Sequence, residues 1–175
     1  NLIKQTNRIV SKKTRIIASQ QQVVRYDLES SDDIKLETED KLINSIKNSI
    51  DDYDIILLSD YGKGVLTKNV TRALIDLANS KDIKVLVDPK GDDYSKYSGA
   101  FLLTPNKKEA SEITKIDIKD RASLTEAAKK LKHDLNLKIS LITMSEEGIA
   151  VYDEELRVKP TINREVYDVT GAGDT

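Results

Sequence analysis

Residues 166–175 read Val-Tyr-Asp-Val-Thr-Gly-Ala-Gly-Asp-Thr, and this stretch determines how the rest of the chain is interpreted. A short β-prone segment leads into Gly171 and Gly173, and Asp174 follows at once. Because glycine has no Cβ, successive backbone N–H groups at this spacing can turn toward a bound anion. A helix that starts here would add its N-terminal N–H groups and its dipole to the same anion site.

A carboxylate beside such an anion site is suited to act as a general base, because it can take a proton from an attacking hydroxyl. The pattern therefore indicates phosphoryl transfer, with Asp174 activating the nucleophile and the backbone amides of 171–173 holding the developing charge. The Gly-x-Gly element alone is also compatible with a tight turn or with the start of a dinucleotide-binding fingerprint.

The composition indicates a globular domain. The chain has 175 residues, of which 38% are hydrophobic and 33% charged, so it can bury a core and remain well solvated. The net charge of −2 supplies no basic field for nucleic acid, and no apolar run approaches the ~20 residues that span a bilayer. The chain has no cysteine, which excludes disulfides and thiolate sites. We expect a cytoplasmic protein that binds neither nucleic acid nor membrane.

The two ends of the chain indicate a fragment. Asn1 is not an initiator methionine, and Thr175 comes where a helix is expected to begin. We therefore expect residues 1–175 to be an internal fragment of one domain.

The first part of the chain is β-like. Segments 8–10, 14–18 and 21–27 are short and rich in β-branched residues, which predicts strands. From pattern alone they are predicted to form an ordinary antiparallel ribbon with solvated charges. Residues 30–39 are polar and acidic and are predicted to form a loop.

Helices and strands alternate from Asp40 onward. Apolar periodicity predicts a first helix from Asp40, and Thr67 is predicted to cap a second one. Residues 123–126 read as a capping box for a later helix. The predicted strands are 55–58, 85–87, 100–104 and 139–143, with a hairpin over 149–158. The alternation predicts an α/β fold, a mostly parallel sheet with helices on both faces, although not the strand order. The apolar run 55–58 is expected to be covered on both sides.

Polar clusters follow four of these strands, at 59–64, 88–92, 104–109 and 143–148. Ligands of open α/β sheets bind beyond the carboxyl ends of the strands, so we expect these clusters to converge on one active site.

Each cluster offers candidate ligands and a plainer alternative. Asp60 and Lys63 are candidates for sugar or phosphate contacts, or members of a polar turn. Asn106 and Glu109 face the same way on a helix, where they either orient water around Mg²⁺ or form a capping box. His133, the only histidine, has no partners for a metal site. Tyr94 and Tyr97 are predicted to pack in the core.

The string at 168–175 resembles the C-terminal motif of the ribokinase-like (PfkB) carbohydrate kinases. Thr-Pro-Asn-x-x-Glu at 104–109 is similar to the family's Asn-x-x-Glu motif. Residues 143–148 resemble its Thr-x-Gly-x-x-Gly turn, with Ser145 in place of the first glycine. The resemblance implies a three-layer α/β/α kinase domain, in which residues 1–30 contribute strands of a small β lid and 40–175 form the core.

A closer resemblance is to the kinase domain of the bacterial heptose 7-phosphate kinases, through residues 21–27, 58–64, 87–91, 102–106 and 166–175. It implies ATP-dependent phosphorylation of the anomeric hydroxyl of D-glycero-D-manno-heptose 7-phosphate. The product is the 1,7-bisphosphate, which feeds ADP-heptose and lipopolysaccharide core synthesis. The resemblance is also compatible with a homodimer and with a fused adenylyltransferase domain outside these residues.

The resemblance assigns roles residue by residue. Asp174 deprotonates the sugar hydroxyl, and the amides of Gly171, Ala172 and Gly173 form the anion hole. Asn106 and Glu109 organise Mg²⁺ through water. The residues assigned to the nucleotide side are Asn106, Glu109, Thr143, Ser145, Gly148 and Lys90. Those assigned to the sugar side are Asp60, Lys63 and Arg25. The two lysines neutralise phosphate either on ATP or on the sugar.

Two alternatives remain at this point: another PfkB-type kinase, for a hexose or a nucleoside, and a non-catalytic module with a kinase fold. Because parts of the sugar and adenine pockets lie outside these residues, we expect the 175-residue polypeptide alone to be inactive or nearly so.

Overall fold

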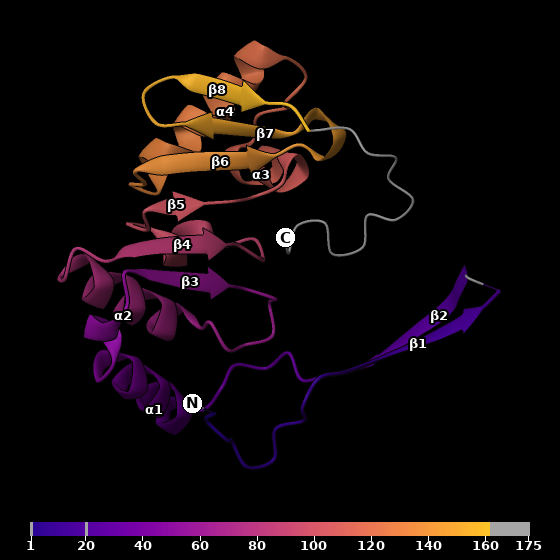
Figure 1. Ribbon diagram of the computed structural model, residues 1–175, viewed down its shortest axis with the longest axis vertical. Helices are drawn as coiled ribbons and strands as arrows, with labels where there is room; N and C mark the ends of the chain where they lie inside the picture. The colour runs from indigo at the N-terminus through magenta and orange to yellow at the C-terminus, as the bar shows by residue number, and fades with distance from the viewer. Residues whose placement is uncertain (1, 20, 162–175) are drawn as a thin grey trace.

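The computed structural model describes residues 2–19 and 21–161, which form two separate sheets (Figure 1). The predicted anion hole and base, at 171–174, lie outside the described residues. A two-stranded sheet pairs β1 (Lys12–Ala18) with β2 (Gln21–Leu28). The larger sheet has the order β3-β4-β5-β6-β7-β8. Its strands are β3 (Ile55–Ser59), β4 (Lys84–Asp88), β5 (Leu102–Leu103), β6 (Ile139–Thr143), β7 (Ile149–Tyr152) and β8 (Leu156–Lys159).

The larger sheet is mostly parallel, as the alternation predicted. Strands β3 to β6 are parallel neighbours, and β7 and β8 continue the sheet as an antiparallel hairpin. The helices of the described residues are α1 (Leu36–Lys47), α2 (Lys68–Asn79), α3 (Lys107–Thr114) and α4 (Arg121–Asp134). Short 3₁₀ turns cover Ile50–Asp52, Tyr94–Tyr97 and Ser145–Glu147. No helix of the described part is long and apolar enough to cross a membrane.

The core lies on one face of the larger sheet. Each connection between parallel strands leads to the next neighbour in the order β3-β4-β5-β6, always in the same direction across the sheet. Because such connections share one handedness, their helices lie on the same face of the sheet. Side chains that point to this face, such as Val85, Leu103 and Ile142, are fully buried. The helices that pack there contribute buried side chains of their own, such as Leu74 and Leu131.

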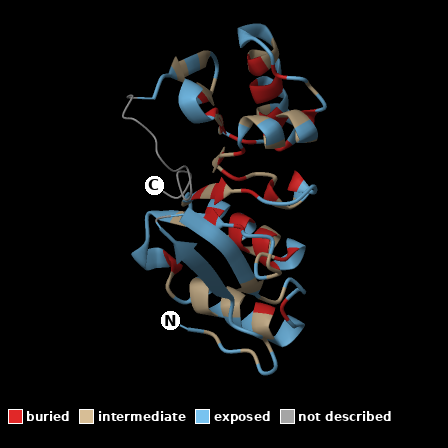
Figure 2. Cartoon of the chain, turned by 90° about the vertical axis from the view of Figure 1, so that its right-hand side faces the viewer, coloured by how far each residue is buried: buried red, intermediate tan, exposed pale blue. Residues whose placement is uncertain are grey.

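The opposite face of the sheet is open within the described residues (Figure 2). Leu57 is 69% exposed and Ile55 is 52% exposed, whereas Leu58, which points to the helices, is 5% exposed. The expectation that 55–58 would be covered on both sides is therefore not met by the described part of the chain. β3 is an edge strand of this sheet, and its neighbouring helices α1 and α2 contact each other.

Two local predictions near the N-terminus are wrong. Residues 8–10 form no strand, and no backbone ladder pairs them with other described residues. The Arg8 guanidinium donates hydrogen bonds to the carbonyls of Asp32, at 2.8 Å, and Lys63. The predicted loop 30–39 contains the start of α1 at Leu36. Glu39 on this helix is buried, and its carboxylate accepts hydrogen bonds from the side chains of α2's first turn.

The β1–β2 ribbon is exposed along nearly its whole length. It extends on the side toward which the arrows of β3 to β6 point, away from the larger sheet (Figure 1). Its strands are antiparallel, with Lys13 opposite Asp27 and Arg15 opposite Arg25. The prediction of an antiparallel ribbon is confirmed.

Candidate active site

The four predicted polar clusters meet at the carboxyl edge of the larger sheet, and hydrogen bonds join each to the next. The Asp60 N–H donates to the Asp88 carbonyl at 2.9 Å. The Thr104 hydroxyl donates to the Asp88 carboxylate at 3.4 Å. The Thr143 N–H donates to the Pro105 carbonyl at 3.0 Å. The expectation that they share one edge is confirmed, because the parallel register brings these strand ends side by side.

Asn106 and Glu109 form a capping box at the start of α3. The Glu109 N–H donates to the Asn106 side chain at 2.9 Å, and the Asn106 N–H donates to the Glu109 carboxylate at 3.0 Å. The other Glu109 oxygen pairs with the Lys90 ammonium at 3.0 Å. The hydrogen bond with Glu109 and its negative charge raise the pKa of Lys90 above its ordinary value. The structure thus brings Lys90, Asn106 and Glu109 together.

A carboxylate has about four lone-pair positions, and the Glu109 carboxylate uses one per oxygen for Asn106 and Lys90. The remaining positions can accept hydrogen bonds from water. Among the described residues, no three acidic, histidine or cysteine side chains gather around a common metal position. One carboxylate with acceptor positions left for water fits a hydrated Mg²⁺, which usually binds proteins through one or two carboxylates together with substrate phosphates.

Asp60 lies at the end of β3 with its side chain 4% exposed. One oxygen accepts a hydrogen bond from the Gly62 N–H at 2.7 Å. The other accepts from the Lys96 ammonium at 2.6 Å and from the Tyr97 hydroxyl at 2.7 Å. Burial by itself raises the pKa of Asp60, but these hydrogen bonds outweigh it and hold the pKa below its ordinary value. The Asp60 carboxylate is therefore charged and fixed in orientation.

A cleft of about 590 Å³ opens beside Asp60. Its polar lining includes Ser11, Lys13, Glu29, Ser59, Asp60 and Lys63. The Lys63 ammonium pairs with Glu29, whose second carboxylate oxygen is buried without a hydrogen-bond partner among the described residues. The cleft therefore places cationic side chains and an acceptor beside apolar surface from Leu57, Val65 and Leu66, the mixed lining typical of small-molecule sites.

Sequence reasoning missed Lys13 and Glu29. Both lie at the base of the ribbon, Lys13 in β1 and Glu29 directly after β2. In the sequence, the one signal that could have pointed to these two residues is their position next to the end of a predicted strand. Arg25, which was predicted to reach the substrate, lies farther along the ribbon, where its guanidinium pairs with Asp27 at 3.1 Å. The structure does not bring Arg25 among the strand-end clusters.

The 143–148 turn depends on two residues in the left-handed region. Ser145 has φ 50°, a conformation that glycine adopts without steric cost, which explains why a glycine also suits this position. Gly148 has φ 94°, and a Cβ built there would lie 2.0 Å from the Lys159 carbonyl oxygen. Glycine at 148 is thus required by the close approach of β8's end, whatever ligand the turn binds.

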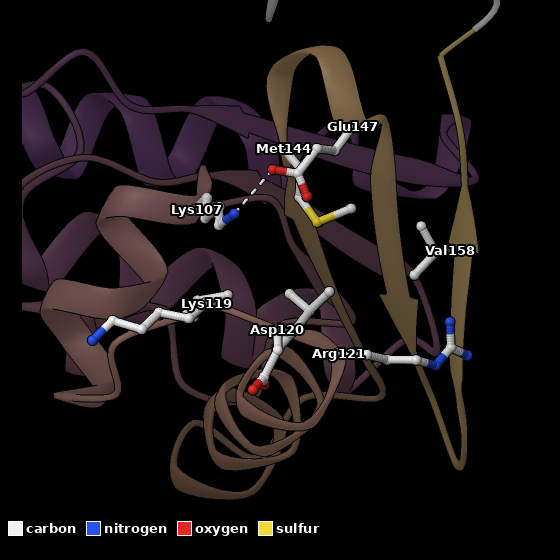
Figure 3. A pocket seen from close by; sticks show the side chains of 9 residues that line it. Lys107, Lys119, Asp120, Arg121, Met144, Glu147 and Val158 are labelled. Atoms are coloured by element: carbon white, nitrogen blue, oxygen red, sulfur yellow. Dashed lines mark hydrogen bonds and ion pairs between the residues drawn. The ribbon is translucent and has the colours of Figure 1, made fainter.

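A second cavity, of about 220 Å³, lies behind this turn, between α4's first turn and β8 (Figure 3). Lys107 and Glu147 form an ion pair of 2.9 Å at its edge, and Met144, Ile118 and Leu124 supply apolar surface. None of the predicted site residues that the structure describes lines it.

The comparison with protein families identifies the family of this chain. The sequence profile of the pfkB family carbohydrate kinases matches residues 2–175. The chain belongs to the pfkB family of carbohydrate kinases. The chain is 61% identical over 175 residues to "Bifunctional protein HldE" of Aliarcobacter butzleri and 57% identical to the protein of that name from Sulfurimonas denitrificans. Each match covers 100% of this chain and 37% of the relative, so the chain spans little more than a third of those proteins.

Two solved kinase structures share the fold. Phosphofructokinase-2 from Escherichia coli, in complex with potassium, matches with a TM-score of 0.74 at 19% identity, over 94% of this chain and 53% of that chain. Ribokinase of Arabidopsis thaliana, complexed with ribose and ATP, matches with a TM-score of 0.71 at 18% identity, over 96% of this chain and 54% of that chain. These likenesses confirm the predicted ribokinase-like α/β fold.

Proposed function

We propose that this chain is part of an ATP-dependent sugar kinase that phosphorylates the anomeric hydroxyl of D-glycero-D-manno-heptose 7-phosphate to the 1,7-bisphosphate. The observation that carries the proposal is that four polar segments, each following a strand, meet at one edge of the sheet. The chain that forms this sheet belongs to a carbohydrate kinase family. The resemblance of these segments to heptose 7-phosphate kinases selects the substrate. Identity of 61% to a relative along the whole chain supports the same choice.

On the sugar side, the cleft beside Asp60 accommodates the phosphorylated heptose. The Asp60 carboxylate, held charged, accepts a hydrogen bond from a sugar hydroxyl, and Lys63 lies close enough to the cleft to neutralise phosphate. We assign residues 1–30 to a β lid over the sugar, because the base of the ribbon lines the same cleft. Arg25 acts there only if the ribbon folds over the substrate.

On the nucleotide side, Lys90 neutralises phosphate charge, and Thr143, Ser145 and Gly148 form the turn beside the ATP phosphates. Asn106 and Glu109 hold hydrated Mg²⁺ through water. Magnesium supplies charge neutralisation at the β- and γ-phosphates when it is bound. The Lys90–Glu109 ion pair keeps the lysine ammonium at this end of the sheet. We assign residues 40–175 to the α/β core of the kinase domain.

The chemical step rests on residues outside the described part of the chain. Asp174 takes the proton of the anomeric hydroxyl as the hydroxyl oxygen attacks the γ-phosphorus of ATP. The bond from the γ-phosphorus to the bridging oxygen breaks and ADP leaves, while the amides of Gly171, Ala172 and Gly173 hold the transferring phosphoryl group. These roles follow from the sequence motif alone.

Replacement of the base tests whether the protein is a catalyst or a non-catalytic module of kinase fold. In the full-length gene product, Asp174→Asn should lower turnover by roughly 10²–10⁴-fold, because it removes the general base. The control is Asp117→Asn, which removes a carboxylate that is 73% exposed on the α3–α4 connection and should leave turnover unchanged. ATP consumption with heptose 7-phosphate is measured, together with thermal unfolding. An unchanged rate in Asp174→Asn would support the non-catalytic module or a different base.

Three further assignments belong to this proposal. The enzyme is cytoplasmic, it forms a homodimer, and an adenylyltransferase domain is fused to the kinase domain. The last is supported by the word "bifunctional" in the relatives' name and by their greater length.

A further inference from the structure

The 3₁₀ turn Tyr94–Tyr97 lies between β4 and β5 and places two side chains against Asp60. Tyr97 is completely buried, and the Lys96 side chain is 17% exposed. The Lys96 ammonium also donates a hydrogen bond to the Leu66 carbonyl at 3.1 Å and lies 5.0 Å from the centre of the Tyr97 ring. Two donors from one turn are therefore directed at one carboxylate from β3's end.

The Tyr97 hydroxyl has a second partner on the neighbouring loop. It lies 2.7 Å from the Asp60 carboxylate, and 3.1 Å from both the backbone nitrogen and the carbonyl oxygen of Lys90. A phenol has one proton to donate, and a charged acceptor gives the stronger hydrogen bond. The consistent assignment is that Tyr97 donates to Asp60 and accepts from the Lys90 N–H. The hydroxyl thus links the loop after β3 to the loop after β4.

These two loops serve different ligands if the proposed function is right. Asp60 lines the cleft assigned to the sugar, and the Lys90 side chain pairs with Glu109 at the nucleotide side. Resting on that function, we propose that Lys96 and Tyr97 are positioning residues. Lys96 fixes the Asp60 carboxylate, and Tyr97 holds Asp60 and the Lys90 backbone at a set separation. The separation of the two substrates would then depend on one buried hydroxyl.

The neighbouring Tyr94 provides a matched control. It is in the same turn, is 3% exposed, and packs edge-on against Tyr97 with ring centroids 5.6 Å apart. Its hydroxyl is buried without a hydrogen-bond partner among residues 2–19 and 21–161. Tyr94→Phe removes one buried hydroxyl from the same part of the core, as Tyr97→Phe does. It leaves the hydrogen bonds of Tyr97 with Asp60 and with the Lys90 backbone in place.

The kinetic test compares Tyr97→Phe, Tyr94→Phe and the wild type in the full-length gene product. Tyr97→Phe should raise the KM values for both ATP and the sugar phosphate and lower kcat/KM about tenfold, the scale of one or two lost hydrogen bonds. Tyr94→Phe should match the wild type. Lys96→Met should raise the KM for the sugar phosphate while leaving the KM for ATP unchanged. If Tyr97→Phe and Tyr94→Phe show the same kinetics, the proposal is overturned.

Hydrogen exchange of the 88–92 loop provides a readout that does not depend on activity. Because the Lys90 N–H loses its acceptor, its exchange in Tyr97→Phe should be about fivefold to tenfold faster. Exchange in Tyr94→Phe and Lys96→Met should be unchanged. Unaltered exchange in Tyr97→Phe contradicts the link even in an active kinase. If the wild type phosphorylates no sugar, the proposed function fails, and the exchange comparison still decides whether Tyr97 holds this loop.

Discussion

At the scale of single residues, Asp60 shows how a strand end in this chain is held. Three donors surround its carboxylate, and one of them, Lys96, is a cation 2.6 Å away. Burial disfavours the charged form, yet the hydrogen bonds dominate and lower the pKa. The charge is therefore part of the folded structure and contributes to stability as well as to the proposed site.

The lowered pKa of Asp60 predicts a pH-dependent contribution to stability. The carboxylate stabilises the fold at pH values above its unfolded pKa of 3.8, and this contribution is lost as the pH falls through the lower folded pKa. Asp60→Asn should reduce the free energy of unfolding by about 3 kcal/mol at neutral pH, because it leaves the Lys96 ammonium without its counter-charge. Chemical denaturation at a series of pH values measures this difference.

The difference between wild type and Asp60→Asn should shrink as the pH falls below 3.8 and through the lower folded pKa of Asp60, where the wild-type carboxyl also becomes neutral. The control Asp51→Asn removes an exposed partner of Lys81 and should have little effect at any pH. A difference that stays constant from neutral to acid pH would show that the Asp60 charge does not stabilise the fold.

Residue-level predictions from short-range patterns were correct at some positions and misplaced at others. Asn106 and Glu109 are three residues apart, and the sequence suggested both the capping box that the structure contains and the water-mediated metal role that is still a proposal. The predicted cap at Ser123 was misplaced, because Asp120 caps α4 and Ser123 bonds back to it. The Lys96 and Tyr97 contacts with Asp60 span 36 and 37 residues, and no periodicity indicates such pairs.

At the scale of elements, α1 shows how a polar composition concealed a helix start. Residues 30–39 look solvated, yet Glu39 is 4% exposed. Its two carboxylate oxygens accept hydrogen bonds from Thr67 and Asn69, each at 2.5 Å. Thr67 is the predicted N-cap of α2, and the structure confirms its bond to the Val70 N–H at 3.2 Å. Glu39 therefore joins α1 to the first turn of α2.

Glu39→Ala should destabilise the protein by about 1–3 kcal/mol, because the buried Thr67 hydroxyl and the Asn69 side-chain amide lose their acceptor. The matched control is Glu37→Ala, on the same helix, whose carboxylate is 78% exposed and pairs with Lys41. That substitution should not measurably change stability. Urea unfolding of both variants makes the comparison. Equal effects of the two substitutions would mean that the buried link between the helices is unimportant.

Strands and helices were predicted well where one face of an element is buried, as in α2 and β6, since burial imposes a clear period. Strand order could not be predicted, because periodicity does not specify which strands are neighbours. The exposure of Leu57 was also missed. A continuous apolar run does not indicate whether one or both faces of its strand are covered, and among the described residues only one face of 55–58 is covered.

At the scale of the whole molecule, the order β3-β4-β5-β6 carries the proposed function. It places four strand ends in a row, so segments up to about 80 residues apart in sequence form one continuous surface. The fold class and this convergence followed from the sequence. The cleft could not be predicted from the sequence, because its walls come from the base of the ribbon and from β3, which are distant in sequence and adjacent only in the folded structure.

The most direct measurement of the central claim is a substrate panel with the full-length gene product, ATP and Mg²⁺. The panel contains heptose 7-phosphate, hexose 6-phosphates, free hexoses and nucleosides, and ³¹P NMR locates the new phosphate. The account predicts the highest kcat/KM for D-glycero-D-manno-heptose 7-phosphate and a new phosphate on its anomeric oxygen. Preference for a hexose or a nucleoside, or phosphate transfer to any other oxygen of the heptose, would contradict it.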